Sequence, residues 1–236
     1  MNVIPVVDLF DGIVVHAKRG DRTKYMPIQS KLTPSSQALD IVTALLGIYP
    51  FKHLYIADLN AIQKLNADYK NNFSVINTIK QRYPELELWV DAGISNNTEL
   101  NYWKKLDVRL ILGSENFVKI DDFNSLDIPA NDFILSLDFM QHGYQGPKEL
   151  LNNTNYWPQD VIVMSLANVG SNSGANNELI HEMISKAKGH NLVAAGGIRN
   201  YADLIDLKNI GIHGVLIATS LHQEQISRPQ FEEMGK

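Results

Sequence analysis

The chain repeats its own pattern at a nearly fixed spacing, and this restricts its fold more than any other sequence feature. An apolar run ending in Ala-Gly-Ile at residues 88–94 returns as Ala-Gly-Gly-Ile at residues 192–198. Gly93 and Gly197 therefore lie 104 residues apart, and Gly113 and Ala218, which end the next apolar runs, lie 105 residues apart. Two independent pairs at almost one offset predict an internal duplication.

An aspartate also closes a short apolar run in each half. Asp8 follows residues 4–7, and Asp138 follows residues 134–137. Apolar runs bounded by turn residues are typical of buried parallel strands. The two aspartates lie 130 residues apart, which predicts about 25 extra residues in the first half. We assign them to a long polar loop at residues 16–36.

Strand and helix patterns alternate along the whole chain. Strands are predicted at residues 3–7, 53–58, 87–90, 109–112, 133–137, 161–164, 192–195 and 214–217. Helices are predicted at residues 36–48, 72–82, 97–106, 177–188 and 201–210, with only a short helix at 120–128. We therefore predict an α/β fold, a single (β/α)8 TIM barrel over residues 1–236, built from duplicated half-barrels of about 1–128 and 129–236.

Composition excludes several classes of function. The 236 residues carry 21 basic and 26 acidic side chains, and the scattered basic residues argue against a nucleic-acid or membrane surface. The absence of cysteine rules out disulfides and thiolate ligands, and the seven histidines show no metal-binding spacing. No stretch is apolar enough to span a membrane, and the N-terminus is unlike a signal peptide. We expect a cytoplasmic protein without a metal, either a monomer or a small homo-oligomer.

The strand-end aspartates are the strongest candidates for chemistry. Barrel enzymes place their active sites at the C-terminal ends of the strands, so Asp8 and Asp138 are predicted to share one mouth. Two carboxylates facing each other can serve as general acid and general base. Asp58 is a candidate third polar group, and His16 and Arg19 in the long loop are candidate contacts for an anionic substrate. The alternative is that each aspartate caps a helix or pairs with a lysine.

An ordered set of motifs resembles one family. They are Ile-Pro-Val-Val-Asp-Leu at 4–9, Asp-Gly at 11–12, Gly-Asp at 20–21, Ala-Asp-Leu-Asn-Ala at 57–61, Ala-Gly-Ile at 92–94, Asp138, Gly170, Gly-Gly-Ile-Arg at 196–199 and Gly-Val-Leu-Ile at 214–217. Together they resemble the histidine-biosynthesis family of duplicated half-barrels. The nearest branch is that of the phosphoribosylformimino-aminoimidazole carboxamide ribotide isomerases.

The resemblance implies an Amadori rearrangement of a phosphorylated aminosugar without a cofactor. Asp8 would be the base at the sugar carbon and Asp138 the acid, with the higher pKa at Asp138. A phosphate site would follow the last two strands, at Gly196, Gly197, Ala218, Thr219 and Ser220. A second, more eroded one would lie at Gly93, Gly113 and Ser114, while Gly170 and Ser171 would also contact substrate. The alternative is that these glycines only form tight turns.

Four residues depart from the isomerase pattern. They are His16, Ser95, Met164 and Val169, and they fall around the reacting sugar rather than at the second-half phosphate site. We therefore predict a substrate that differs from the histidine-pathway intermediate. The sequence also resembles isomerase-like proteins encoded beside one-carbon cofactor (methanopterin and methanofuran) genes. A barrel lyase or condensing enzyme in such a pathway, and a non-catalytic barrel that binds a phosphorylated metabolite, remain alternatives.

Overall fold

The fold is a closed barrel of parallel strands, as predicted. The structure is a computed structural model that describes residues 1–16, 25–64, 70–165 and 175–235. The barrel strands run in the order β1 (Asn2–Phe10), β4 (His53–Asp58), β5 (Glu87–Asp91), β6 (Arg109–Gly113), β7 (Phe133–Met140), β9 (Asp160–Ser165), β10 (Asn191–Ala195) and β11 (Gly214–Ile217). Parallel pairing of β11 with β1, from Asn2–Gly214 to Pro5–Ile217, closes the ring.

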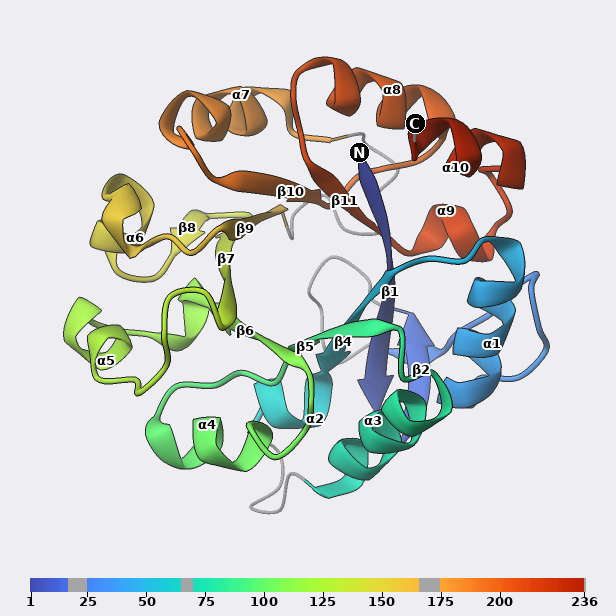
Figure 1. Ribbon diagram of the computed structural model, residues 1–236, viewed down its shortest axis with the longest axis horizontal. Helices are drawn as coiled ribbons and strands as arrows, with labels where there is room; N and C mark the ends of the chain where they lie inside the picture. Colours follow the sequence, from blue (N-terminus) through green and yellow to red (C-terminus); the bar gives the residue numbers. More distant parts are fainter. Residues whose placement is uncertain (17–24, 65–69, 166–174, 236) are drawn as a thin grey trace.

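Helices surround this ring (Figure 1). The longer ones are α1 (Ala38–Ile48), α3 (Lys70–Arg82), α7 (Asn177–Lys186) and α8 (Tyr201–Asn209). Shorter ones are α2 (Leu59–Ile62), α4 (Asn97–Trp103), α5 (Ile120–Asn124), α6 (Lys148–Asn152), α9 (Thr219–His222) and α10 (Arg228–Met234), with 3-10 turns η2 (Ser114–Asn116) and η3 (Thr154–Tyr156). Among the described residues, no helix combines the length and apolarity that crossing a membrane requires.

Alternation along each strand separates two apolar layers. In β1, Val7 and Leu9 face outward into the layer beneath the helices, whereas Ile4 belongs to the barrel interior. In β7, Leu135 and Leu137 face outward and Ile134 faces inward. Successive side chains on a strand point to opposite faces, so an inward row ends on the residues that reach the mouth.

The duplication is visible in the loops that begin α4 and α8. Gly93 and Gly197 both adopt positive φ, at 60° and 80°. Three residues later, Asn96 and Asn200 cap α4 and α8 by accepting backbone N–H bonds from the third residue of each helix. The same turn chemistry therefore recurs 104 residues apart.

Two hairpins that the sequence reading missed rise above the barrel. β2 (Ile13–His16) pairs antiparallel with β1, and β8 (Gly143–Gln145) pairs antiparallel with β7. A short strand, β3 (Met26–Pro27), extends the first hairpin, so part of the predicted long loop is ordered β structure. Asp11 and Gly12 both have positive φ, which fits the type I′ turn favoured between paired strands.

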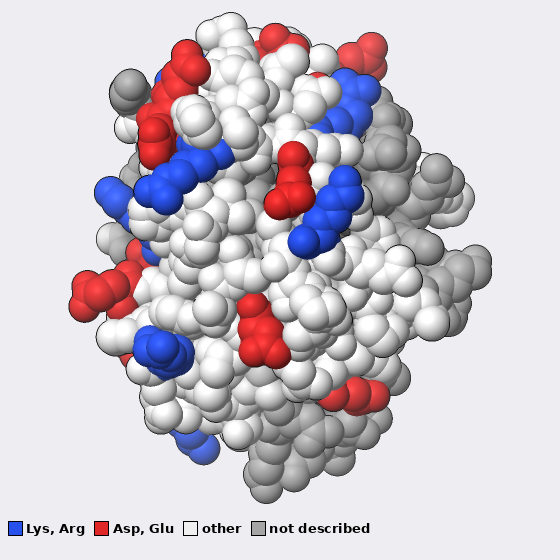
Figure 2. Space-filling view, turned by 90° about the vertical axis from the view of Figure 1, so that its right-hand side faces the viewer, with Lys and Arg blue, Asp and Glu red and all other residues white. Residues whose placement is uncertain are grey.

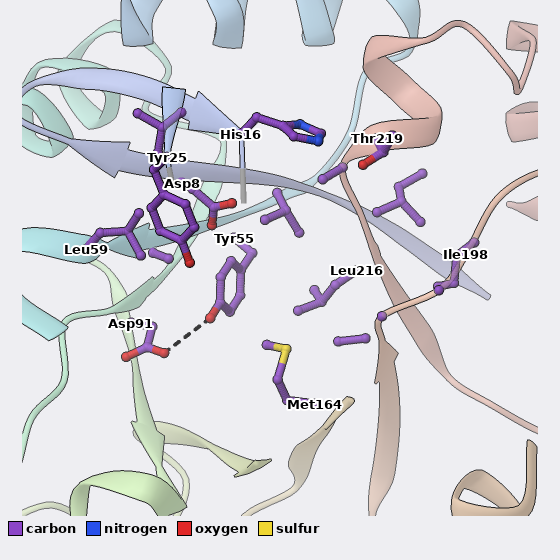
Figure 3. A pocket seen from close by; sticks show the side chains of 18 of the residues that line it. Asp8, His16, Tyr25, Tyr55, Leu59, Asp91, Met164, Ile198, Leu216 and Thr219 are labelled. Atoms are coloured by element: carbon purple, nitrogen blue, oxygen red, sulfur yellow. Dashed lines mark hydrogen bonds between the residues drawn. The ribbon is translucent and has the colours of Figure 1, made fainter. Parts of the chain in front are cut away.

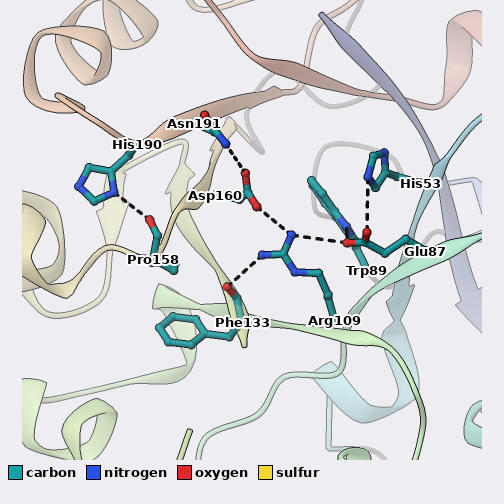
Figure 4. Close-up of polar contacts among 9 residues, drawn as sticks. All are labelled: His53, Glu87, Trp89, Arg109, Phe133, Pro158, Asp160, His190 and Asn191. Carbon is teal, nitrogen blue, oxygen red and sulfur yellow. Dashed lines mark hydrogen bonds and ion pairs between the residues drawn. The ribbon is translucent and has the colours of Figure 1, made fainter. Parts of the chain in front are cut away.

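Polar side chains close the opposite, N-terminal end of the barrel (Figure 4). Arg109 donates to Asp160 at 2.8 Å and lies 3.5 Å from Glu87. Asn191 donates to Asp160 at 2.9 Å, and the indole of Trp89 donates to Glu87 at 2.8 Å. These bonds link four barrel strands, so we assign the network to stability.

Among the described residues, no concentration of basic charge is visible on the face seen in Figure 2. Lys and Arg side chains there lie among Asp and Glu side chains, separated by uncharged surface. This mixture is consistent with the scattered basic residues of the sequence.

Candidate active site

A cavity of about 160 Å³ occupies the C-terminal mouth of the barrel (Figure 3). Its polar lining comprises Asp8, His16, Tyr25, Tyr55, Asp91, Glu115, Asp138, Arg199, Thr219 and His222. Its apolar lining includes Val6, Leu59, Met164, Ile198 and Leu216. The mouth therefore combines a carboxylate-rich side with a side formed by glycines, histidines and a threonine.

Asp8 and Asp138 reach this cavity from opposite strands. β1 is the first strand of the barrel and β7 the fifth, and they lie across the ring from each other (Figure 1). Asp8 continues the inward row of Ile4 and Val6, and Asp138 continues that of Ile134 and Ser136. The strand periodicity thus brings both carboxylates into one pocket.

Asp138 is held by a dense set of donors. The Ser136 hydroxyl donates to its Oδ1 at 2.6 Å, and the Glu115 backbone N–H donates to its Oδ2 at 3.1 Å. The Ser114 hydroxyl lies 3.3 Å from the same Oδ2. Burial raises the pKa of Asp138 to about 8, and the charges of Glu115 and Asp91 raise it further. The hydrogen bond from Ser136 acts in the other direction and lowers this pKa. The side chain is therefore fixed in orientation and largely protonated at neutral pH.

Asp8 has a different environment. It is half-buried, and no described residue donates a hydrogen bond to its carboxylate. Burial raises the pKa of Asp8 to about 7, with a further contribution from the charge of Asp91. Both carboxyl groups thus have pKa values raised to near neutrality, about 7 at Asp8 and about 8 at Asp138.

Tyr55 and Asp91 belong to the site although the sequence reading did not select them as site residues. The Tyr55 hydroxyl donates to Asp91 Oδ2 at 3.2 Å, and Gly93 N–H donates to Asp91 Oδ1 at 3.1 Å (Figure 3). Burial raises the pKa of Tyr55 well above its usual value, and the charges of Asp91, Asp8 and Asp138 raise it further. The hydroxyl is therefore a permanent donor. The position of Tyr55 in the apolar run of β4, on the inward-facing row, is the sequence feature from which its place in the site could have been predicted.

The second-half glycine site is open to the cavity. Gly196, Gly197, Ala218 and Thr219 all line it. Gly196 has φ of 103°, and a side chain there would collide with the Ser165 carbonyl. Glycine is thus required for the backbone to pass this point with its amides near the mouth. Ser220, predicted with them, is fully buried outside the lining.

The predicted first-half site residues do not line the cavity. A Cβ on Gly93 would lie 2.7 Å from Ile62 Cα, so this glycine serves close packing of α2. A Cβ on Gly113 would lie 3.2 Å from Asp138 Oδ2. The Ser114 hydroxyl donates to the Gln145 carbonyl at 2.7 Å and accepts from Asp138 N–H at 2.9 Å. These three residues support Asp138 and the loops and do not line the cavity.

Asp58 is also misplaced by the sequence prediction. It is fully buried, and its Oδ1 caps α2 by accepting from Ala61 N–H at 3.1 Å and binds Asn72 at 2.6 Å. Burial raises the pKa of Asp58 to about 6, against the lowering effect of its hydrogen bonds. Asp58 holds the loop after β4 rather than contacting the cavity.

The departures from the isomerase pattern have different positions. His16 and Met164 line the cavity. Ser95 is turned toward α4, where its N–H and hydroxyl bind Glu99 at 2.8 and 3.1 Å. Arg19, Val169, Gly170 and Ser171 lie outside the described residues. Within the described residues no group of three His, Asp or Glu side chains is arranged to hold a metal ion.

His222 is a further cavity residue that was not predicted from the sequence. It lies on α9, is 3% exposed, and has its Nδ1 3.0 Å from the Ser30 hydroxyl. Burial lowers the pKa of His222 to about 4, and nearby His16 lowers it further. The ring is therefore neutral at physiological pH.

Comparison with known proteins agrees with this architecture. The profile of the family described as "Histidine biosynthesis protein" matches residues 2–227. An uncharacterized protein of Methanocaldococcus jannaschii is 32% identical over 94% of each chain. Two further relatives are named 1-(5-phosphoribosyl)-5-((5-phosphoribosylamino)methylideneamino)imidazole-4-carboxamide isomerase. The one from Caldicellulosiruptor saccharolyticus is 29% identical over 94% of each chain. The one from Leuconostoc mesenteroides is 24% identical over 98% of this chain and 99% of its own. Because the family profile matches nearly the whole barrel, the chain belongs to the histidine biosynthesis protein family.

Proposed function

We propose that this protein is an aldose–ketose isomerase that performs an Amadori-type rearrangement on a phosphorylated aminosugar. The observation that carries the proposal is the pair Asp8 and Asp138, which enter one cavity from opposite strands with separated, raised pKa values. An acid and a base near neutrality are what this reaction needs at either side of the sugar. The isomerase names of several relatives support the same reaction class.

The proposed reaction begins with ring opening. Asp138, protonated near neutral pH, donates its proton to the furanose ring oxygen, and the C1–O bond breaks as the C1 nitrogen forms an iminium. Asp8, ionised once the pH exceeds its pKa of about 7, removes the proton from C2. The resulting enaminol takes a proton at C1 and loses one from the C2 hydroxyl, which gives the aminoketose. The reaction neither gains nor loses atoms or electrons.

The phosphate of the substrate is proposed to bind at the second-half glycine site. Gly196, Gly197 and Thr219, which follow the last two barrel strands, line the cavity and can present backbone and hydroxyl groups to it. The corresponding first-half residues Gly93 and Gly113 do not line the cavity. A substrate with one phosphate fits this arrangement, whereas the relatives' names specify a substrate with two phosphoribosyl groups. We therefore propose a substrate different from theirs.

The alternative functions lack comparable support. A Schiff-base lyase needs a lysine in the site, and no lysine lines the cavity among the described residues. A protein that only binds a metabolite has no need for two carboxyl groups in one cavity whose charged forms are disfavoured.

The test is conversion of N-substituted ribosylamine 5-phosphates, followed by NMR of the sugar carbons. The wild type is expected to form the 1-amino-1-deoxyribulose product from at least one member of the panel. Asp8→Asn and Asp138→Asn should each lower kcat by about 10²–10⁴-fold, the usual contribution of a general acid or base. Asp132→Asn, an exposed carboxylate in the loop before β7, is the matched control and should leave kcat unchanged. Failure of the wild type on every member, or full activity in Asp8→Asn, contradicts the proposal.

A further inference from the structure

The imidazole of His222 carries a buried nitrogen with no partner in the part of the chain that the structure describes. Its Nε2 has no accessible surface and no hydrogen bond, although the residue lines the mouth cavity. Buried polar atoms in native proteins nearly always have a partner, so an orphan of this kind indicates a missing ligand. Thr219, one turn earlier on α9, lines the same cavity.

The hydrogen-bond chain behind His222 determines what this nitrogen offers. The Ser30 hydroxyl oxygen accepts the Leu32 N–H at 3.2 Å and lies 3.0 Å from His222 Nδ1. Among the described residues the Ser30 hydroxyl has no acceptor other than His222 Nδ1, so we assign the Ser30 proton to that nitrogen. A neutral imidazole that accepts at Nδ1 bears its own proton at Nε2. The orphan is then a buried N–H donor on a residue that lines the cavity.

The ring is fixed from the first half of the barrel. Lys31 N–H donates to the His222 carbonyl at 2.9 Å, and the Lys31 ammonium lies 3.3 Å from the Gln223 carbonyl. Together with the Ser30 contact, these bonds hold α9 against the segment that follows β3. The donor is therefore preorganised before any ligand arrives.

The surroundings of His222 select an anion. Gly196, Gly197 and Thr219 line this side of the cavity, and the carboxylates Asp8, Asp91 and Asp138 belong to the first, third and fifth barrel strands. Arg199 also lines the cavity and donates two side-chain bonds to Asp203. The hydroxyl of Thr219, the His222 ring and the glycine backbone can all donate, and donors suit a phosphoryl group, whose oxygens only accept when it is fully ionised.

We propose that His222 is a phosphate ligand, with its Nε2–H donating to an oxygen of a phosphate monoester seated beside Gly197 and Thr219. The inference rests on the proposed function for the place of the phosphate and adds the residue that recognises it. Ser30 acts as a positioning residue, since it reaches the ligand only through the His222 ring.

Calorimetric titration with ribose 5-phosphate, and with ribose as the unphosphorylated control, tests the donor. His222→Phe keeps an aromatic ring but removes the donor, and should weaken ribose 5-phosphate binding by about 10–100-fold. His222→Gln can place an amide N–H near the same point and should restore most of the affinity. His181→Phe, on the exposed side of α7, is the matched control and should bind as the wild type does. Equal affinity in His222→Phe and wild type overturns the proposal.

Nitrogen NMR of the wild type provides a readout that does not depend on how the variants fold. The free protein should show His222 protonated at Nε2, and added inorganic phosphate should shift that N–H resonance. Ser30→Ala should leave the ring without its Nδ1 partner and mix the two tautomers. A proton on Nδ1 in the wild type, a resonance unmoved by phosphate, or no phosphate binding at all overturns the proposal.

The two proposals fail separately. Isomerase turnover that is lost in Asp8→Asn while His222 ignores phosphate contradicts the His222 assignment alone. A His222 resonance that responds to phosphate in a protein without isomerase turnover contradicts the proposed function alone.

Discussion

Asp8 and Asp138 occupy equivalent places in two hairpins: Asp8 pairs with Val15 across β1 and β2, and Asp138 pairs with Gln145 across β7 and β8. In each case the partner lies seven residues further along the chain. The hairpins fix the backbone beside each carboxylate while the barrel strand aims the side chain inward. Each half-barrel thus supplies one carboxylate beside a rigid hairpin. The two carboxylates have different neighbours, and the pKa of Asp138 is about 8 whereas that of Asp8 is about 7.

The first prediction is a narrow pH optimum. Asp8 must be ionised, so turnover should fall as the pH drops below about 7, and Asp138 must be protonated, so turnover should fall as the pH rises above about 8. In Asp138→Asn any residual activity should lose the alkaline limb and keep the acid one. The pH dependence of kcat over this range checks both limbs. A flat profile contradicts the assigned protonation states.

The second prediction is that Asp8→Asn stabilises the protein at high pH. Burial raises the pKa of Asp8 from 3.8 to about 7, so the folded state disfavours the ionised form. The contribution of Asp8 to stability is present below its unfolded pKa and is lost as the pH rises through about 7. Because Asp8 is half-buried, solvent screening limits the gain, and we expect about 1–2 kcal/mol at pH 8.5 and little at pH 4. Urea unfolding of the wild type and Asp8→Asn at both pH values measures this gain in stability. A larger gain at pH 4 than at pH 8.5 would contradict the prediction.

The accuracy of the sequence predictions depended on how far a local pattern fixes side-chain direction. Apolar runs placed all eight barrel strands, and β4 and β11 begin and end where the runs do. The position of Asp8 and Asp138 at the C-terminal ends of inward rows followed from the same runs. The hairpin strands β2 and β8 were missed because each is only three or four residues long.

Small polar residues after strands were harder to interpret. Ser114 and Thr219 both follow a strand and read alike in sequence, but Ser114 binds the Gln145 carbonyl from β8 whereas Thr219 lines the cavity. Gly93 and Gly197 share positive φ, but of the two only Gly197 lines the cavity. Which of two equivalent loops stays open depends on a distant segment, and no local pattern encodes it.

The third prediction concerns the number of phosphates. Doubly phosphorylated sugar ligands should bind no more than about threefold better than singly phosphorylated ones, since among the described residues only the second-half glycines line the cavity. Gly197→Val should weaken binding of the singly phosphorylated ligand by at least about tenfold. Gly189→Val is the control, because Gly189 has a similar φ of 89° in the loop before β10, away from the mouth. A large gain from the second phosphate places another anion site in the mouth.

The fourth prediction is that the protein rescues a strain lacking the histidine-pathway isomerase poorly or not at all. The departures at Met164 and His16 lie in the cavity lining, and lost polar contacts at about 1–3 kcal/mol each lower the rate by orders of magnitude. Growth without histidine, at matched expression, is the measurement. Robust growth that disappears in Asp8→Asn or Asp138→Asn would instead identify the histidine intermediate as a substrate.

Solvent isotope incorporation tests the central claim, that Asp8 and Asp138 rearrange an aminosugar by proton transfer. Turnover of an accepted ribosylamine 5-phosphate in D₂O should give an aminoketose that carries deuterium at C1, because the proton added there passes through an exchangeable carboxyl group. Both Asp8→Asn and Asp138→Asn should suppress formation of this product. Product that retains the original C2 hydrogen at C1 without solvent deuterium, or that forms at the wild-type rate in either variant, contradicts the account.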